Sequence, residues 1–237
     1  MATKKASTTK KNNWEVTADR YVGFIDIMGF KDMVARMSHQ EIYEMMKEID
    51  RVKKENEAIK WNGGEEKLIS STFYSDSIIL YSKDATYNSA YYMLCTLSAL
   101  TEDLLVSGIP HKGALSFGRM TLDNARSIFF GQPLIDAFQL QEELNMYGII
   151  LHASVEQELH KQNFEEGLFF EEYNCPFKGG LSSHLTVPPL SAGTAEKKDE
   201  EKLIQSLKIF RHRTSGHIRK YVDNTENFIK FLCATKS

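Results

Sequence analysis

The run YVGFIDIM, residues 21–28, contains one charged side chain, Asp26, among apolar neighbours. A short apolar run of this kind is typical of a strand that is buried on both faces of a sheet. A carboxylate inside such a strand is costly unless a cation or a metal ion lies beside it. Asp26 is therefore the first candidate for a functional residue.

A second carboxylate, Asp76, lies at the tip of a predicted hairpin. Two strand-like runs, residues 68–74 and 78–81, are separated only by Ser75, Asp76 and Ser77, which predicts a tight turn. Taken alone, Asp76 is better explained as a carboxylate that caps this turn. Its relation to Asp26 makes it a candidate.

The order of the predicted elements brings the two carboxylates together. A long helix after Phe30 precedes the hairpin, and a helix over residues 86–107 and a strand over residues 112–117 follow it. This order predicts an α+β fold with a ferredoxin-like or palm-type β-α-β-β-α-β sheet. In that sheet the first and third strands are antiparallel neighbours, so Asp26 and Asp76 should meet.

The rest of the chain continues the same alternation of strands and helices. We expect these elements in the following places: a turn at Gly118, a strand ending at Phe130, a helix opening after Gly131-Gln132-Pro133, a strand over 149–153, a helix over 154–160, strands over 168–173 and 183–187, and two amphipathic helices over 203–235.

The composition bounds the number of domains and the cellular setting. With 237 residues, 42% hydrophobic and 26% charged, the chain buries one sizeable core. We expect a disordered basic tail over residues 1–18, the main domain over residues 19–190, and over residues 191–237 a linker with helices that serve packing or dimerisation. A net charge of −3 gives no general attraction to nucleic acid. No run is apolar enough for a membrane span or signal peptide, which predicts a cytoplasmic protein.

Two carboxylates without nearby Cys or His ligands favour Mg²⁺ or Mn²⁺. Two such ions can neutralise a triphosphate and stabilise both sides of a displacement at phosphorus. Gly29 stands directly before a helix and lets the backbone approach phosphate oxygens, which the N–H groups from Ile27 to Phe30 could bind. The sequence thus predicts a site for two divalent ions and a nucleotide.

Four segments in order resemble motifs of class III nucleotide cyclases. FIDIMGF (24–30) is similar to their first-strand motif, and FYSDSIIL (73–80) to their metal-bearing hairpin. RSIFFG (126–131) resembles their strand–turn–helix segment, and FKGG (177–180) the segment that contacts phosphates. Each motif is short, and the resemblance spans about residues 21–187.

The resemblance implies roles for particular residues. Asp26 and Asp76 would be the metal ligands, Ile27 would contribute its backbone carbonyl, and Lys178 would contact phosphate from the partner chain. An ordinary loop lysine is an equal explanation for Lys178. The family also implies a homodimer with its active sites at the interface.

The sequence departs from the family at the base-reading positions. Purine cyclases use a polar pair there, whereas this chain has Thr72 and Ile128. The helix positions that normally carry Asn and Arg hold Ile135 and Gln139. Another cation must then stabilise the developing charge, and Lys112, Arg119 and Arg126 are the candidates, although each is also explained as a surface charge.

This pattern most resembles the pyrimidine cyclases of bacterial Pycsar antiphage systems. That resemblance implies conversion of UTP to cyclic UMP and pyrophosphate, with a separate effector protein that responds to the product. CTP as substrate, an adenylate or guanylate cyclase with unusual base contacts, and a catalytically silent nucleotide-sensing module are the alternatives. Thr72 could hydrogen-bond a pyrimidine edge.

Overall fold

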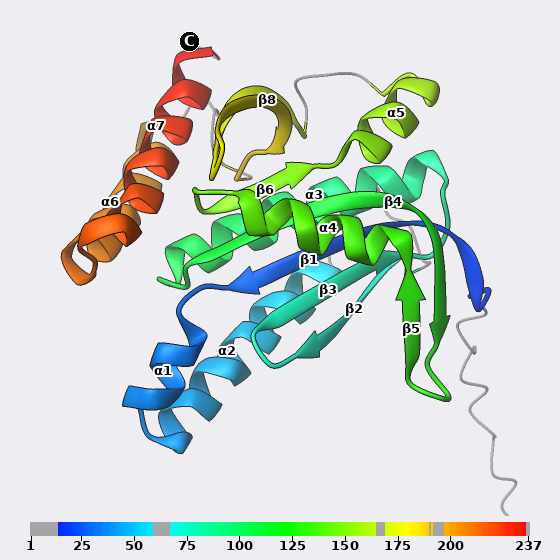
Figure 1. The fold of residues 1–237 in the computed structure, drawn as a ribbon, viewed down its shortest axis with the longest axis horizontal. Helices are drawn as coiled ribbons and strands as arrows, with labels where there is room; N and C mark the ends of the chain where they lie inside the picture. The colour runs from blue at the N-terminus through cyan, green and yellow to red at the C-terminus, as the bar shows by residue number, and fades with distance from the viewer. Residues whose placement is uncertain (1–13, 59–66, 165–168, 190, 192–196, 236–237) are drawn as a thin grey trace, which may run out of the picture.

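The computed structural model describes residues 14–58, 67–164, 169–189, 191 and 197–235. Within these residues the centre of the fold is one eight-stranded sheet in the order β2-β3-β1-β4-β6-β8-β7, with β5 paired to β4 beside that path (Figure 1). The β4–β6 pair is parallel, and the other pairs are antiparallel. The predicted neighbourhood of the first and third strands is confirmed.

The strands and helices have the following bounds. The strands are β1 Thr17–Ile27, β2 Ile69–Tyr74, β3 Ser77–Ser82, β4 His111–Asp123, β5 Ile128–Gly131, β6 Gly148–Leu151, β7 Glu171–Phe177 and β8 Gly180–Val187. The helices are α1 Phe30–Arg36, α2 His39–Ala58, α3 Tyr87–Val106, α4 Gln132–Glu143, α5 Ala153–Lys161, α6 Lys197–Arg213 and α7 Arg219–Thr235, with a 3₁₀ turn, η2, at Gly216–Ile218.

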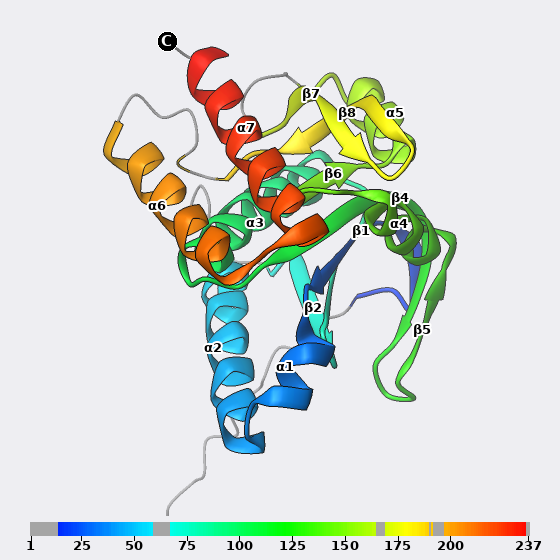
Figure 2. The same cartoon turned by 60° about the vertical axis from the view of Figure 1, so that its left-hand side comes forward.

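Different helices pack on the two faces of the sheet. Side chains of β1 alternate between the faces, and Tyr21 and Ile27 pack with α2, α3 and α5 in the larger hydrophobic cluster. Phe24 points to the other face, where its ring meets Phe138 of α4 with centroids 5.4 Å apart. Figures 1 and 2 show α4 lying across this second face. Asp26 shares the alternation of Phe24 and therefore lies on the α4 face.

Large apolar side chains remain exposed on and around the α4 face. They come from the end of β2, from β5 and from α4, and we call them the exposed apolar group: Tyr74, Ile128, Phe130, Ile135 and Phe138. Tyr74 and the two α4 residues lie on the α4 side, whereas Ile128 and Phe130 alternate with Phe129 and lie on the other face of β5. Exposed apolar side chains that gather in one region are typical of an interaction surface.

The beginning of β1 corrects the expected limit of the N-terminal tail. The strand begins at Thr17, and the Trp14 ring meets Tyr81 edge-on with centroids 6.0 Å apart. The side chain of Arg20 is fully buried and donates to the Ser82 carbonyl at 2.8 Å, which fastens this strand to the end of β3. The predicted disorder up to residue 18 is therefore wrong for residues 14–18, and residues 1–13 lie outside the described residues.

The turn predicted at Gly118 is also wrong. β4 continues as one strand from His111 to Asp123, and Gly118 pairs with Arg20 of β1 inside it. A φ of 155° at Gly118 is an extended conformation that glycine adopts without strain, so the strand bends and does not reverse. The reversal occurs further on, between β4 and β5.

The C-terminal helices belong to the same core as the sheet. One cluster joins Phe24 of β1 and Ala137 of α4 to Leu207 of α6 and to Val222 and Phe228 of α7. Figure 2 shows the two helices side by side against the end of the sheet. The predicted pair of helices is confirmed. None of the described helices combines the length and the apolar character that a membrane span requires.

Candidate active site

The structure brings Asp26 and Asp76 together at the end of β1. Asp26 pairs with Ser77, the first residue of β3, and Asp76 directly precedes that residue. The Ile27 N–H donates to the Asp76 carbonyl at 2.8 Å. Ser75 has a φ of 55°, which gives the tight turn that holds Asp76 at the tip of the hairpin. The convergence predicted from the order of the elements is confirmed.

Burial and a neighbouring like charge perturb Asp26. Its pKa is raised to about 6, first by burial and second by the carboxylate of Asp76. The charge of Lys112 acts in the opposite direction. A partly buried carboxylate with a second one beside it gains from a cation placed between them.

Lys112 is the cation candidate that the structure places beside Asp26. The two residues are direct partners in the β1–β4 pairing, and Lys112 is only 5% exposed. Its ammonium group lies 3.8 Å from a carboxylate oxygen of Glu142 and donates to the Glu142 carbonyl at 3.3 Å. Burial lowers the pKa of Lys112, while Glu142 and Asp26 favour its charged form. Glu142, which sequence reasoning did not single out, is thus part of the site.

Lys178 lies at the turn between β7 and β8, in the FKGG segment. Its ammonium group is 3.8 Å from Glu142 and 3.7 Å from Glu143 at the end of α4. The hairpin runs over 171–177 and 180–187, longer than the strands predicted at 168–173 and 183–187. Lys112 and Lys178 therefore share Glu142 as a partner within one chain.

Arg119 and Arg126 lie away from the two aspartates. Arg119 pairs with Asp19 in the β1–β4 register, seven residues along β1 from Asp26, which is roughly 23 Å in an extended strand. Arg126 is exposed near the β4–β5 turn and forms an ion pair with Asp123 at 2.8 Å. Within one chain neither arginine reaches the site that contains Asp26.

Some of the backbone N–H groups between β1 and α1 already form hydrogen bonds within the chain. Gly29 has a φ of 77°, a left-handed conformation that favours glycine, and it caps α1. The Ile27 N–H donates to Asp76, and the Met28 N–H donates to the Pro110 carbonyl at 2.8 Å. The expectation that all N–H groups from Ile27 to Phe30 bind phosphate is therefore wrong for the first two, which leaves those of Gly29 and Phe30.

Thr72 lines an apolar cavity of about 390 Å³ on the α4 face of the sheet. Its hydroxyl is 3.1 Å from that of Tyr81, and the two form a polar pair in the wall. Ser127 and Phe129 also line the cavity, whereas Ile128 points away, because neighbouring side chains of β5 alternate. Tyr81 was missed in the sequence, although the hairpin register puts it diagonally across from Thr72.

The donor set fits a divalent ion whose coordination a nucleotide completes. Among the described residues, no group of three or more His, Cys, Asp or Glu side chains could hold a metal alone. Mg²⁺ is commonly bound by one or two carboxylates together with substrate phosphates. Asp26 and Asp76 provide such a pair, and a cation bound between them would oppose the burial and the like charge that raise the pKa of Asp26.

Comparison of the sequence with protein-family models and with curated proteins gives no significant match. Solved structures do match, and they define the fold as that of nucleotide cyclase catalytic domains. The catalytic core of a rhodopsin-guanylyl cyclase with converted specificity, in complex with ATPalphaS, has a TM-score of 0.51 and 13% identity, covering 73% of this chain and 96% of its own. The guanylate cyclase domain of RhGC from Catenaria anguillulae, in complex with GTP, has a TM-score of 0.50 and 14% identity, covering 73% of this chain and 97% of its own.

Proposed function

We propose that this protein is a metal-dependent nucleotide cyclase that converts UTP to cyclic UMP and pyrophosphate. The observation that carries the proposal is the meeting of Asp26 and Asp76 at the end of β1, with the pKa of Asp26 raised by burial and by Asp76. The fold shared with guanylate cyclase domains supports the same chemistry.

The proposed reaction forms a bond between the ribose 3′-oxygen and the α-phosphorus. The bond from that phosphorus to pyrophosphate breaks, and the hydroxyl proton passes to solvent. Two divalent ions, Mg²⁺ or Mn²⁺, would neutralise the triphosphate and acidify the attacking hydroxyl. In this scheme Asp26, Asp76 and the Ile27 carbonyl hold the ions, and the backbone at Gly29 and Phe30 faces phosphate oxygens.

Lys112 and Lys178 are the proposed phosphate-binding cations, with Lys178 acting beside Lys112 of its own chain and not from the partner chain as the resemblance implied. Lys112 is supported by its pairing with Asp26 and by its burial, since a charge in a partly dehydrated site acts strongly on a nearby anion. Lys178 is supported by its shared partner Glu142. In the protein without nucleotide, Glu142 forms ion pairs with both lysines. The triphosphate would compete with Glu142 for the two ammonium groups.

A homodimer is part of the proposal. Its support is the exposed apolar group: Tyr74 and the residues of α4 lie on the same side of the sheet as Asp26, and Ile128 and Phe130 lie on the other face of β5. A second copy of the chain would cover these side chains. The apolar cavity of that copy would then face the two aspartates of the first chain. Arg119 and Arg126, remote from Asp26 in one chain, would then be tested as cations contributed by the partner.

The preference for a pyrimidine rests on the apolar cavity. Among the described residues, its lining contains the hydroxyl pair of Thr72 and Tyr81 and no charged side chain. Hydroxyls can both donate and accept, which suits the alternating polar edge of uracil or cytosine. CTP is therefore the nearest alternative substrate, and ATP or GTP follows. The resemblance to Pycsar cyclases further suggests a second messenger in antiphage defence that a separate effector recognises.

Product analysis tests the function directly. The protein is incubated with each of the four ribonucleoside triphosphates and Mn²⁺, and the products are identified by mass. We expect cyclic UMP from UTP, abolished in Asp26→Ala and Asp76→Ala variants that keep the wild-type circular dichroism. Absence of any 3′,5′-cyclic product, with nucleotide still bound, would favour a silent nucleotide-sensing module.

A further inference from the structure

The α6–α7 pair touches the segment that carries the charged end of α4. Residues Tyr221, Asn224, Thr225 and Phe228 recur at helical spacing on one face of α7. That face is directed at residues 145–147, which connect α4 to β6. The α6–α7 pair therefore contacts the site indirectly, through this short connection.

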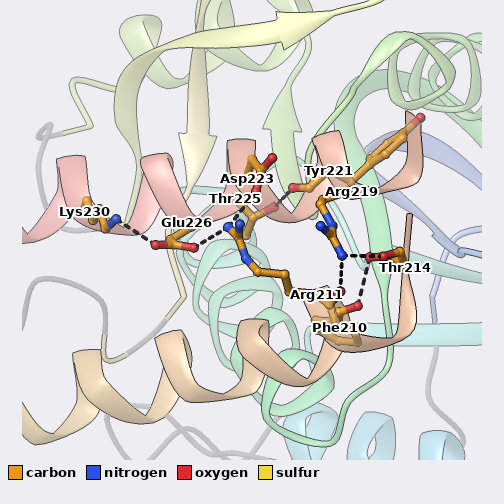
Figure 3. Close-up of polar contacts among 9 residues, drawn as sticks. All are labelled: Phe210, Arg211, Thr214, Arg219, Tyr221, Asp223, Thr225, Glu226 and Lys230. Atoms are coloured by element: carbon orange, nitrogen blue, oxygen red, sulfur yellow. Dashed lines mark hydrogen bonds and ion pairs between the residues drawn. The ribbon is translucent and has the colours of Figure 1, made fainter. Parts of the chain in front are cut away.

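The joint between α6 and α7 is fixed by polar contacts on another side of α7 (Figure 3). Arg211 of α6 forms ion pairs with Asp223 at 2.6 Å and with Glu226 at 2.8 Å. Arg219 donates to the carbonyls of Arg211 at 3.1 Å and Thr214 at 3.0 Å, which closes the turn between the helices. These contacts hold the first turns of α7 at a defined angle to α6.

The first turns of α7 in turn hold the α4–β6 connection. Asn224 donates its side-chain amide to the Asn145 carbonyl at 2.8 Å, and the Tyr147 N–H donates to the Thr225 hydroxyl at 2.8 Å. The Thr225 hydroxyl itself donates to the Tyr221 carbonyl at 2.8 Å. The rings of Tyr147 and Tyr221 stack with centroids 5.9 Å apart. Tyr147 and Thr225 are almost fully buried, so their hydrogen bond has no water to replace it.

The end of α4, which leads into this connection, carries the partners of both lysines of the site. The Asn145 N–H donates to the Pro176 carbonyl at 2.8 Å, and the Lys178 N–H donates to the Glu143 carbonyl at 2.9 Å. Lys112 donates to the carbonyl of Glu142 at 3.3 Å. A shift of this segment therefore moves Glu142 and the turn that carries Lys178 together.

We propose that Asn224 and Thr225 are positioning residues, through which the α6–α7 pair sets the places of Lys112 and Lys178 for the triphosphate. The proposal rests on the proposed function in assigning these lysines to phosphate. Groups that bind a charged substrate need a supporting shell of hydrogen bonds, because an error of about 1 Å weakens binding considerably. The C-terminal helices are then part of the nucleotide site, although they contribute no side chain to it.

The test compares Thr225→Val, which removes the hydroxyl, with Thr225→Ser, which keeps it. Thr235→Val is the matched control, because Thr235 lies on the same helix and its hydroxyl bonds only to the carbonyls of Phe231 and Leu232 among the described residues. Asn224→Ala provides a second, partly exposed position should Thr225→Val fail to fold. Binding of inorganic triphosphate with Mg²⁺ is measured by calorimetry on the full chain, and KM and kcat are measured with the preferred nucleotide.

We expect Thr225→Val and Asn224→Ala to bind triphosphate about tenfold more weakly, the effect of one lost buried hydrogen bond. KM should rise by a similar factor with little change in kcat, and Thr225→Ser and Thr235→Val should match the wild type. Unchanged triphosphate binding in both Thr225→Val and Asn224→Ala, or an equal loss in Thr235→Val or Thr225→Ser, overturns the proposal. If the wild type binds triphosphate and forms no cyclic product, the proposed function fails while the binding comparison still decides this inference.

Discussion

Replacing Asp26 by Asn should stabilise the metal-free protein while it abolishes turnover. The carboxylate is partly buried next to Asp76, which raises its pKa from 3.8 to about 6. A carboxyl group whose pKa is higher in the folded state contributes stability below pH 3.8, and this contribution is lost as the pH rises through 6. Above pH 6 the ionised group therefore opposes folding, and the neutral amide of the Asp26→Asn variant removes that opposition.

The size of the effect follows from the pKa shift. A shift of about two pKa units corresponds to about 3 kcal/mol, since each unit is about 1.4 kcal/mol. Because Asp26 keeps some contact with solvent, screening reduces the gain in the free energy of unfolding to about 1–2 kcal/mol at about pH 8. At about pH 3.5 the wild-type carboxyl is mostly protonated in both states, and the difference should nearly vanish.

Urea unfolding in the presence of a chelator measures this difference for the wild type and Asp26→Asn at these two pH values. Asp103→Asn, at an exposed position on α3, is the control and should change stability little. Added Mn²⁺ and nucleotide should raise the melting temperature of the wild type and leave that of Asp26→Asn unchanged, because ligand binding stabilises only a protein that binds it.

The buried His111 gives the opposite pH dependence. Burial lowers its pKa to about 4, so its contribution to stability is present above its unfolded pKa of 6.5 and is lost as the pH falls toward 4. In the wild type the titration of Asp26 partly offsets this loss over the same range. The Asp26→Asn variant should therefore lose stability more steeply on acidification. The account of Asp26 as a carboxylate whose ionised form opposes folding would be refuted by either of two results. One is an Asp26→Asn variant that is less stable than the wild type at about pH 8, and the other is a variant that loses stability on acidification no more steeply than the wild type.

Lys112→Gln should raise KM for the nucleotide about tenfold or more, whereas Lys161→Gln, at an exposed position on α5 on the other face of the sheet, should leave it unchanged. Equal effects in steady-state kinetics would contradict the placement of Lys112. Tyr81→Phe and Thr72→Val keep the cavity volume close to that of the wild type and should reduce the discrimination between UTP and CTP, measured as the ratio of their kcat/KM values. An unchanged ratio would show that the two hydroxyls do not take part in base recognition. Phe130→Glu should convert a dimer to a monomer in light scattering and abolish turnover without changing the circular dichroism; a dimer that persists would exclude β5 from the interface.

Local sequence patterns predicted the elements that depend on near neighbours. The apolar run around Asp26 forms a central strand, and the turn at Ser75-Asp76 forms the hairpin. Ser38 and Glu41 stand three residues apart, the spacing of a capping box, and the Ser38 N–H donates to the Glu41 carboxylate at 2.8 Å where α2 begins. Because the order of these elements restricts the sheet to few topologies, the meeting of the two aspartates also followed from the sequence.

Other features depended on contacts between distant segments. The sequence by itself determined that Asp26 is an exceptional carboxylate on a buried strand, because periodicity and turn chemistry act over a few residues. Only the tertiary structure decided that Lys112 lies beside Asp26, that Glu142 contacts both Lys112 and Lys178, and that α7 bonds to the connection between α4 and β6. The physical reason is that β4, α4, the β7–β8 turn and α7 meet only when the whole core packs, and no local pattern records which charged side chains then become neighbours.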